Sequence, residues 1–264
     1  MTLAYIPPTI AGIVLAYRRK YLLGGIITAL FIALQIRSNH IQMSYYFMFV
    51  ILFIIGAYFE EAYKKKELTH FFKASAILAL AAMVGVCINL SNLYHTYEYS
   101  KETMRGKSEL KQEGNAANQT SSGLDRDYIT NWSYGIGETL TLLVPNVKGG
   151  ASSDNLSQSE TAMEKANPMY SSIYSQFPQY FGDQPWTAGP VYVGAFVMFL
   201  FVLGCFIVKG PLKWALLGAT IFSVLLSWGK NFMGLTDFFI DYVPMYNKFR
   251  AVSSILVIAE FTIP

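Results

Sequence analysis

The sequence predicts an all-α membrane protein, a polytopic bundle of transmembrane helices with one large extracytoplasmic loop domain. Three observations lead to this prediction. Apolar residues make up 53% of the chain and charged residues only 14%, against roughly 25% charged residues in ordinary globular proteins. The apolar residues gather into seven runs separated by short charged clusters. The density of basic residues alternates from one cluster to the next, which is typical of multi-pass proteins.

The seven apolar runs are the predicted spans. Most are about 16 to 19 residues long, near the short end of what crosses a hydrocarbon core about 30 Å thick. A buried helix of a water-soluble protein normally keeps a polar stripe, but residues 51–58 and 191–208 are apolar on every face. In lipid such segments must be helical, because a helix satisfies its own backbone hydrogen bonds. The predicted spans are 1–17, 21–36, 44–59, 74–90, 190–208, 212–228 and 251–264.

The basic residues predict the orientation of these spans. Dense clusters lie at 18–20, 64–73 and 209–213, while the intervening short loops hold fewer Lys and Arg residues. By the positive-inside rule the dense clusters are cytoplasmic. The N-terminus and the loop 91–189 are then extracytoplasmic, and every span agrees with this assignment.

The predicted organisation has three parts. Residues 1–90 form four transmembrane helices, 91–189 the extracytoplasmic loop domain, and 190–264 two further helices and the start of another. The last run stops after 14 residues, too short to cross a bilayer, which predicts that the chain is an internal fragment of a longer protein. The net charge of +3 is not gathered into a patch, so no nucleic-acid partner is expected. Cys87 and Cys205 lie inside apolar runs and are predicted to be core residues.

Aromatic residues are dense in the second half of the loop domain, and two explanations are open. The loop packs onto the bilayer surface, which Trp and Tyr favour, or its rings form a platform on which sugars stack. The aromatic residues concerned are Tyr170, Tyr174, Phe177, Tyr180, Phe181 and Trp186.

The sequence contains no common catalytic or nucleotide-binding motif, but two polar clusters follow predicted spans at the external face. The first contains His40 and Gln42, whose side chains are costly near lipid unless they face water or a bundle interior. The second places Glu98, Lys101 and Arg105 on one helical face. Arg105 has the planar fork that matches phosphate oxygens. The alternative for Glu98 is a solvated ion pair with Lys101, which contributes little.

The third cluster leads into the last span and ends at Arg250. This arginine is a candidate phosphate ligand, or it extends to the lipid headgroups from the end of a membrane helix. Glu260 lies within the last span, where a carboxylate is expected to have a buried partner or a water-filled cavity.

Short stretches of these clusters resemble the YfhO family of bacterial multi-spanning membrane proteins. They are residues 40–42 (HIQ), 97–100 (YEYS) followed by Met104 and Arg105, and 243–250 (VPMYNKFR). The whole chain is similar to the middle of a Bacteroides-type member. The stretch 93–97 before Glu98 lacks the proline that the family tends to have there.

The resemblance implies a GT-C-like fold in the bacterial cytoplasmic (inner) membrane. It implies transfer of a sugar from a polyprenyl-phosphate donor to a cell-envelope glycopolymer or lipid acceptor at the external face. The principal catalytic Asp would lie upstream of Met1, which leaves the catalytic residues of this chain unknown. The implied substrate-binding residues are His40, Gln42, Glu98, Arg105 and Arg250, with the two arginines at the leaving phosphate and His40 and Glu98 at the acceptor.

No metal ligand and no certain cofactor are predicted, and the resemblance leaves a divalent metal open. Two other functions remain in view. A transporter or lipid flippase would also need a polar cavity, with broken helices in repeated halves. A non-catalytic membrane protein of envelope assembly would need neither a polar cavity nor broken helices. The lipid bilayer is an expected partner in every case.

Overall fold

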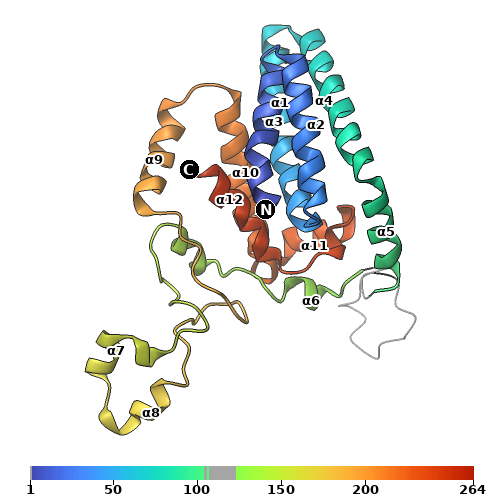
Figure 1. Cartoon of the computed structure of the whole chain (residues 1–264). Coiled ribbons are helices and arrows are strands. Elements are labelled where there is room, and N and C mark those ends of the chain that lie inside the picture. The colour runs from blue at the N-terminus through green and yellow to red at the C-terminus, as the bar shows by residue number, and fades with distance from the viewer. Residues whose placement is uncertain (1, 104–105, 107–122) are drawn as a thin grey trace. The chain divides into compact units, whose positions relative to one another are not determined.

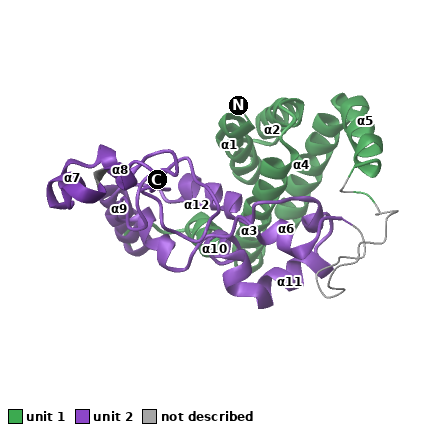
Figure 2. Ribbon diagram, turned by 90° about the horizontal axis from the view of Figure 1, so that it is seen from below, with its two compact units in different colours: residues 1–112, 207–221 green, residues 113–206, 222–264 purple. Residues whose placement is uncertain are grey.

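The computed structural model describes residues 2–103, 106 and 123–264. Over these residues the chain is helical, with no strand and one isolated antiparallel bridge between Asn155 and Pro178 (Figure 1). The predicted all-α class is therefore confirmed for the described part of the chain. The chain divides into two compact units (Figure 2): unit 1 is Met1–Gln112 with Ile207–Ile221, and unit 2 is Glu113–Phe206 with Phe222–Pro264.

Unit 1 is a helical bundle in which the second helix, α2, packs against both α1 and α4. A short 3₁₀ turn, Thr2–Tyr5, precedes the first helix. The helices are α1 (Ile6–Tyr17), α2 (Tyr21–Arg37), α3 (Ile41–Lys65), α4 (Leu68–Ile88) and α5 (Leu90–Lys101).

Two helices, α3 and α4, are long and apolar enough to cross a membrane. A third span is counted if α10 (Pro211–Ser227) is joined to the bent segment Gly229–Tyr242 that follows it at 106°. The other apolar helical segments are shorter, at 10–17 residues. Length and composition therefore support a membrane protein, while the seven crossings stay a prediction.

The outward faces of several helices consist of large apolar side chains. On α2, Leu22 is 79% exposed, and on α9 (Ala195–Ile207) Phe206 is 82% exposed. None of the described residues of α9 is buried. Soluble monomers rarely expose contiguous apolar patches of more than a few hundred Å², so lipid is the medium that these faces fit. Cys87 is free and exposed on α4, and so is not the core residue that the sequence predicted.

Small residues let α1 and α2 approach closely. A methyl group on Gly24 would lie 2.6 Å from the backbone nitrogen of Ala16 and 2.6 Å from the carbonyl oxygen of Gly12. Gly12 and Ala16 are four residues apart on α1, and Gly24 and Thr28 are four apart on α2. This small-xxx-small spacing is common where membrane helices pack backbone to backbone.

A buried amide joins α2 to the end of α4. The side chain of Asn89 donates hydrogen bonds to the carbonyl oxygens of Ala33, at 2.9 Å, and Gly85, at 3.2 Å, and the residue is only 7% exposed. We expect Asn89→Leu to lower the free energy of unfolding by about 1 kcal/mol. The exposed Asn92, three residues later, is the control, and Asn92→Leu should change it little. Thermal unfolding in detergent measures both, and equal effects would refute the role given to Asn89.

Unit 2 contains short helices around a small core. The core residues Tyr134 and Leu142 of the loop pack with Leu256, Ala259 and Ile263 of the last apolar run. Its α-helices, besides α9 and the end of α10, are α6 (Arg126–Thr130), α7 (Glu160–Lys165), α8 (Ser171–Tyr174), α11 (Met233–Tyr242) and α12 (Val257–Thr262). Its 3₁₀ segments are Gly137–Leu142, Leu156–Gln158, Pro168–Tyr170, Gly229–Phe232, Tyr246–Lys248 and Val252–Leu256.

Candidate functional site

The first predicted cluster lies at the turn between α2 and α3. His40 is exposed and occupies the residue before α3. Gln42 is half-buried and donates a hydrogen bond to the hydroxyl of Tyr46 at 3.0 Å. The Asn92 amide of α5 donates a long hydrogen bond, 3.5 Å, to the side-chain oxygen of Asn39. The turn therefore contacts the start of α5, six residues before Glu98.

In the second cluster, Glu98 forms an ion pair with Lys101. This pair is the alternative to a substrate-binding role that the sequence offered for Glu98. Its carboxylate accepts a hydrogen bond from the ammonium of Lys101 at 2.7 Å, and both side chains are nearly half exposed. The same ammonium lies over the ring of Tyr97. Because the pair is solvated, its contribution to stability is small. Arg105 lies outside the described residues.

The third cluster belongs to unit 2, where Arg250 lies against two aromatic rings. Its guanidinium carbon is 5.8 Å from the ring centroids of both Tyr128 and Trp132. One guanidinium nitrogen donates to the hydroxyl of Tyr128 at 2.9 Å. The Arg250 residue is exposed. These distances make a cation–π contact with each ring, and the planar guanidinium matches the geometry of phosphate and carboxylate oxygens.

A second arginine of unit 2, Arg126, was not among the predicted residues. Its guanidinium donates to Asp237 at 2.6 Å and to Asp241 at 2.7 Å. The two carboxylates are four residues apart on α11 and therefore share one face of that helix. The Arg126 side chain is 19% exposed. This fork holds α6 against α11.

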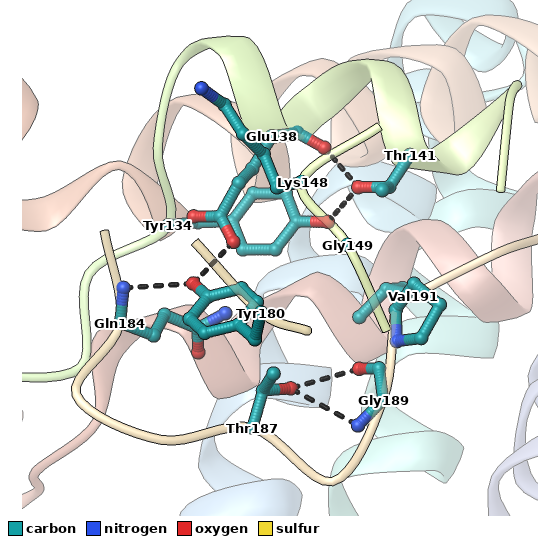
Figure 3. Close-up of a pocket in the computed structure, with 11 residues that line it drawn as sticks. Tyr134, Glu138, Thr141, Lys148, Gly149, Tyr180, Gln184, Thr187, Gly189 and Val191 are labelled. Atoms are coloured by element: carbon teal, nitrogen blue, oxygen red, sulfur yellow. Dashed lines mark hydrogen bonds between the residues drawn. The ribbon is translucent and has the colours of Figure 1, made fainter. Parts of the chain in front are cut away.

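Glu138 carries a buried carboxylate in unit 2, and the residue is 2% exposed (Figure 3). One of its oxygens accepts a hydrogen bond from the Tyr180 hydroxyl at 2.5 Å. The other accepts from the backbone nitrogens of Gly135, at 2.7 Å, and Asp183, at 3.4 Å. A buried carboxylate is tolerated only when it is hydrogen-bonded in this way.

Glu138 borders a small pocket with room for little more than a water molecule. The tyrosines around it stay protonated at neutral pH. Burial, and then the hydrogen bond to Glu138, raise the pKa of Tyr180 well above its ordinary value. Burial also raises the pKa of Tyr134 to about 12. The residues that line the pocket are Tyr134, Glu138, Thr141, Lys148, Gly149, Tyr180, Gln184, Thr187, Gly189, Pro190 and Val191.

A cation borders the same pocket without pairing with Glu138. The ammonium of Lys148 lies over the ring of Phe181, 5.7 Å from its centroid. Within 2–103, 106 and 123–264, no ion pair joins Lys148 to any carboxylate. The Lys148 ammonium points away from the Glu138 carboxylate and the Tyr180 hydroxyl (Figure 3). The polar groups at the pocket include that carboxylate and the tyrosine hydroxyls.

The sequence contained one signal for Glu138: it is an acidic residue inside the largely apolar and aromatic segment 132–144 of the loop. Its importance was missed because the groups that bury it are distant in sequence. Glu260, by contrast, lies exposed on α12. The part of the chain that the structure describes contains no group of three or more His, Cys, Asp or Glu residues able to hold a metal ion.

Comparison with known proteins assigns no family to the chain. No family model, no curated protein and no solved structure matches it.

Proposed function

We propose that this protein is a membrane-embedded glycosyltransferase that moves a sugar from a polyprenyl-phosphate donor to a cell-envelope acceptor at the external face. The observation that supports it most is Arg250. An exposed guanidinium in cation–π contact with Tyr128 and Trp132, at the start of an apolar segment, has the chemistry that recognises a lipid-borne phosphate. The resemblance of residues 243–250 to the YfhO family supports the same assignment.

The proposed reaction is a direct displacement at the anomeric carbon. A hydroxyl oxygen of the acceptor forms a bond to that carbon while the carbon–oxygen bond to the lipid phosphate breaks. The hydroxyl proton passes to a base, and the phosphate leaves with the bonding electron pair. Arg250 would stabilise the negative charge that develops on the phosphate oxygens.

A lipid flippase or transporter is the second candidate, and one observation favours it. The helix pair Pro211–Ser227 and Gly229–Tyr242 is bent by 106°, and broken helices are typical of transporter binding sites.

The experiment that separates the two uses the full chain purified in detergent and returned to liposomes. A glycosyltransferase transfers label from a radiolabelled polyprenyl-phosphate hexose to an envelope glycopolymer fraction. A flippase moves the labelled lipid to the other leaflet and leaves the sugar attached. Lipid movement without any sugar transfer would overturn the proposal.

A further inference from the structure

The pocket around Glu138 is a second polar site of unit 2, and the role proposed for Arg250 does not involve it. Its walls hold a buried carboxylate and two tyrosines whose hydroxyls stay protonated at neutral pH. These groups come from two parts of the loop, around Glu138 and around Tyr180 (Figure 3). Sites that fix the orientation of a ligand commonly combine a few convergent polar groups in this way.

Hydrogen bonds hold the Glu138 carboxylate in place before any ligand arrives. Tyr180 donates to one oxygen, and the backbone nitrogen of Gly135 donates to the other. The hydroxyl of Tyr180 in turn accepts a hydrogen bond from the backbone nitrogen of Gln184 at 2.9 Å. Each carboxylate oxygen has two lone-pair directions. Because Oε2 accepts from the backbone nitrogens of both Gly135 and Asp183 and Oε1 accepts from Tyr180, Oε1 retains one direction for a further hydrogen bond.

The size and polarity of the pocket restrict what fits. It admits a group about as large as a water molecule. A hydroxyl group has that size, and it can donate a hydrogen bond to a carboxylate. A phosphate or carboxylate fits less well, because its negative charge would meet that of Glu138.

We propose that this pocket binds one hydroxyl group of a saccharide, with Glu138 accepting its hydrogen bond. That the saccharide is the acceptor of sugar transfer rests on the function proposed above. Two exposed aromatic residues, Phe181 and Trp186, are sequence neighbours of the lining residues Tyr180 and Thr187, and such rings offer apolar faces for the remainder of a sugar ring.

The test measures sugar binding separately from sugar transfer. Saturation-transfer NMR on the detergent-purified full chain uses glucose, galactose, mannose, rhamnose and N-acetylglucosamine as probes. At least one should bind to the wild type. Glu138→Gln, which replaces an acceptor oxygen by a donor amide, should weaken that binding at least tenfold. Tyr180→Phe, which keeps the ring, should weaken it in the same direction.

The matched control is Glu164→Gln, because Glu164 is an exposed glutamate of α7 in the same loop. It should bind the sugar as the wild type does. Thermal unfolding of each variant shows whether the loop still folds. If Glu138→Gln unfolds at a lower temperature than the wild type, the sugar binding of Tyr180→Phe is the test of the pocket. Absence of binding by the wild type, or equal binding by Tyr180→Phe, overturns the pocket assignment.

The transfer assay keeps the two proposals apart. Sugar binding that depends on Glu138, in a protein that transfers no sugar, supports the pocket and refutes the transferase. Transfer with an acceptor KM that is unchanged in both variants supports the transferase and refutes the pocket as the acceptor site.

Discussion

Replacing Arg250 by Ala is expected to reduce sugar transfer about 100-fold or more while the protein still folds. The guanidinium is the group proposed to stabilise the leaving phosphate, and loss of one such donor typically costs 10²–10³ in kcat. The side chain is exposed, so its removal leaves no cavity in the core. The measurement is the initial rate of label transfer from a polyprenyl-phosphate hexose, with the thermal unfolding of each variant beside it.

Two further variants show whether the effect belongs to the guanidinium. Arg250→Lys keeps the charge but loses the planar fork that can bind two phosphate oxygens and that contacts the rings of Tyr128 and Trp132. It should retain part of the activity, about one tenth. Lys165→Ala removes an exposed cation of α7 and should leave the rate unchanged. Transfer by Arg250→Ala at the wild-type rate would remove Arg250 from the site.

Replacing Gly24 by Ala is expected to destabilise the bundle of unit 1 by about 1 to 3 kcal/mol. The added methyl group would lie 2.6 Å from backbone atoms of Ala16 and Gly12. These are not flexible side-chain atoms, so α1 and α2 must move apart to accept it. The change removes close backbone packing, which is a principal source of helix association in lipid. Thermal unfolding in detergent measures the effect.

At Gly56 of α3, substitution by Ala is not expected to destabilise the bundle. A methyl group there meets no atom within 4 Å. Because Ala favours a helix over Gly by about 1 kcal/mol, Gly56→Ala should be neutral or slightly stabilising. If Gly24→Ala and Gly56→Ala shifted the unfolding temperature alike, the close packing of α1 and α2 would be refuted.

The helices of unit 1 were predictable because their apolar runs are uninterrupted. The run 21–36 became α2 at Tyr21–Arg37. The third helix is longer than its run of 44–59 and ends at Lys65. Its last turns are charged, and the pairs Glu60–Lys64 and Glu61–Lys65 support them at helical spacing. Hydropathy alone does not predict such charged helical turns.

The polar contacts of unit 2 were not predictable, because their partners are far apart in the sequence. Tyr180 and Asp183, which bind the Glu138 carboxylate, lie 42 and 45 residues from it. Arg126 pairs with carboxylates 111 and 115 residues further on. Arg250 was predicted from its residue type and its place beside an apolar run. The rings that it contacts, 118 or more residues earlier, became visible only in the fold.

The central claim is that the apolar helices cross a bilayer and leave the loop 91–189 outside. Cysteine labelling tests it most directly, in a chain whose Cys87 and Cys205 are replaced by Ser. Ser153→Cys introduces a thiol at an exposed position of the loop, and Lys20→Cys one at an exposed position of the first basic cluster. A membrane-impermeant maleimide is applied to intact cells, with any outer membrane permeabilised. The account predicts that Ser153→Cys is labelled on intact cells and Lys20→Cys only after lysis. Labelling of Ser153→Cys only after lysis, or equal labelling of both positions on intact cells, would contradict it.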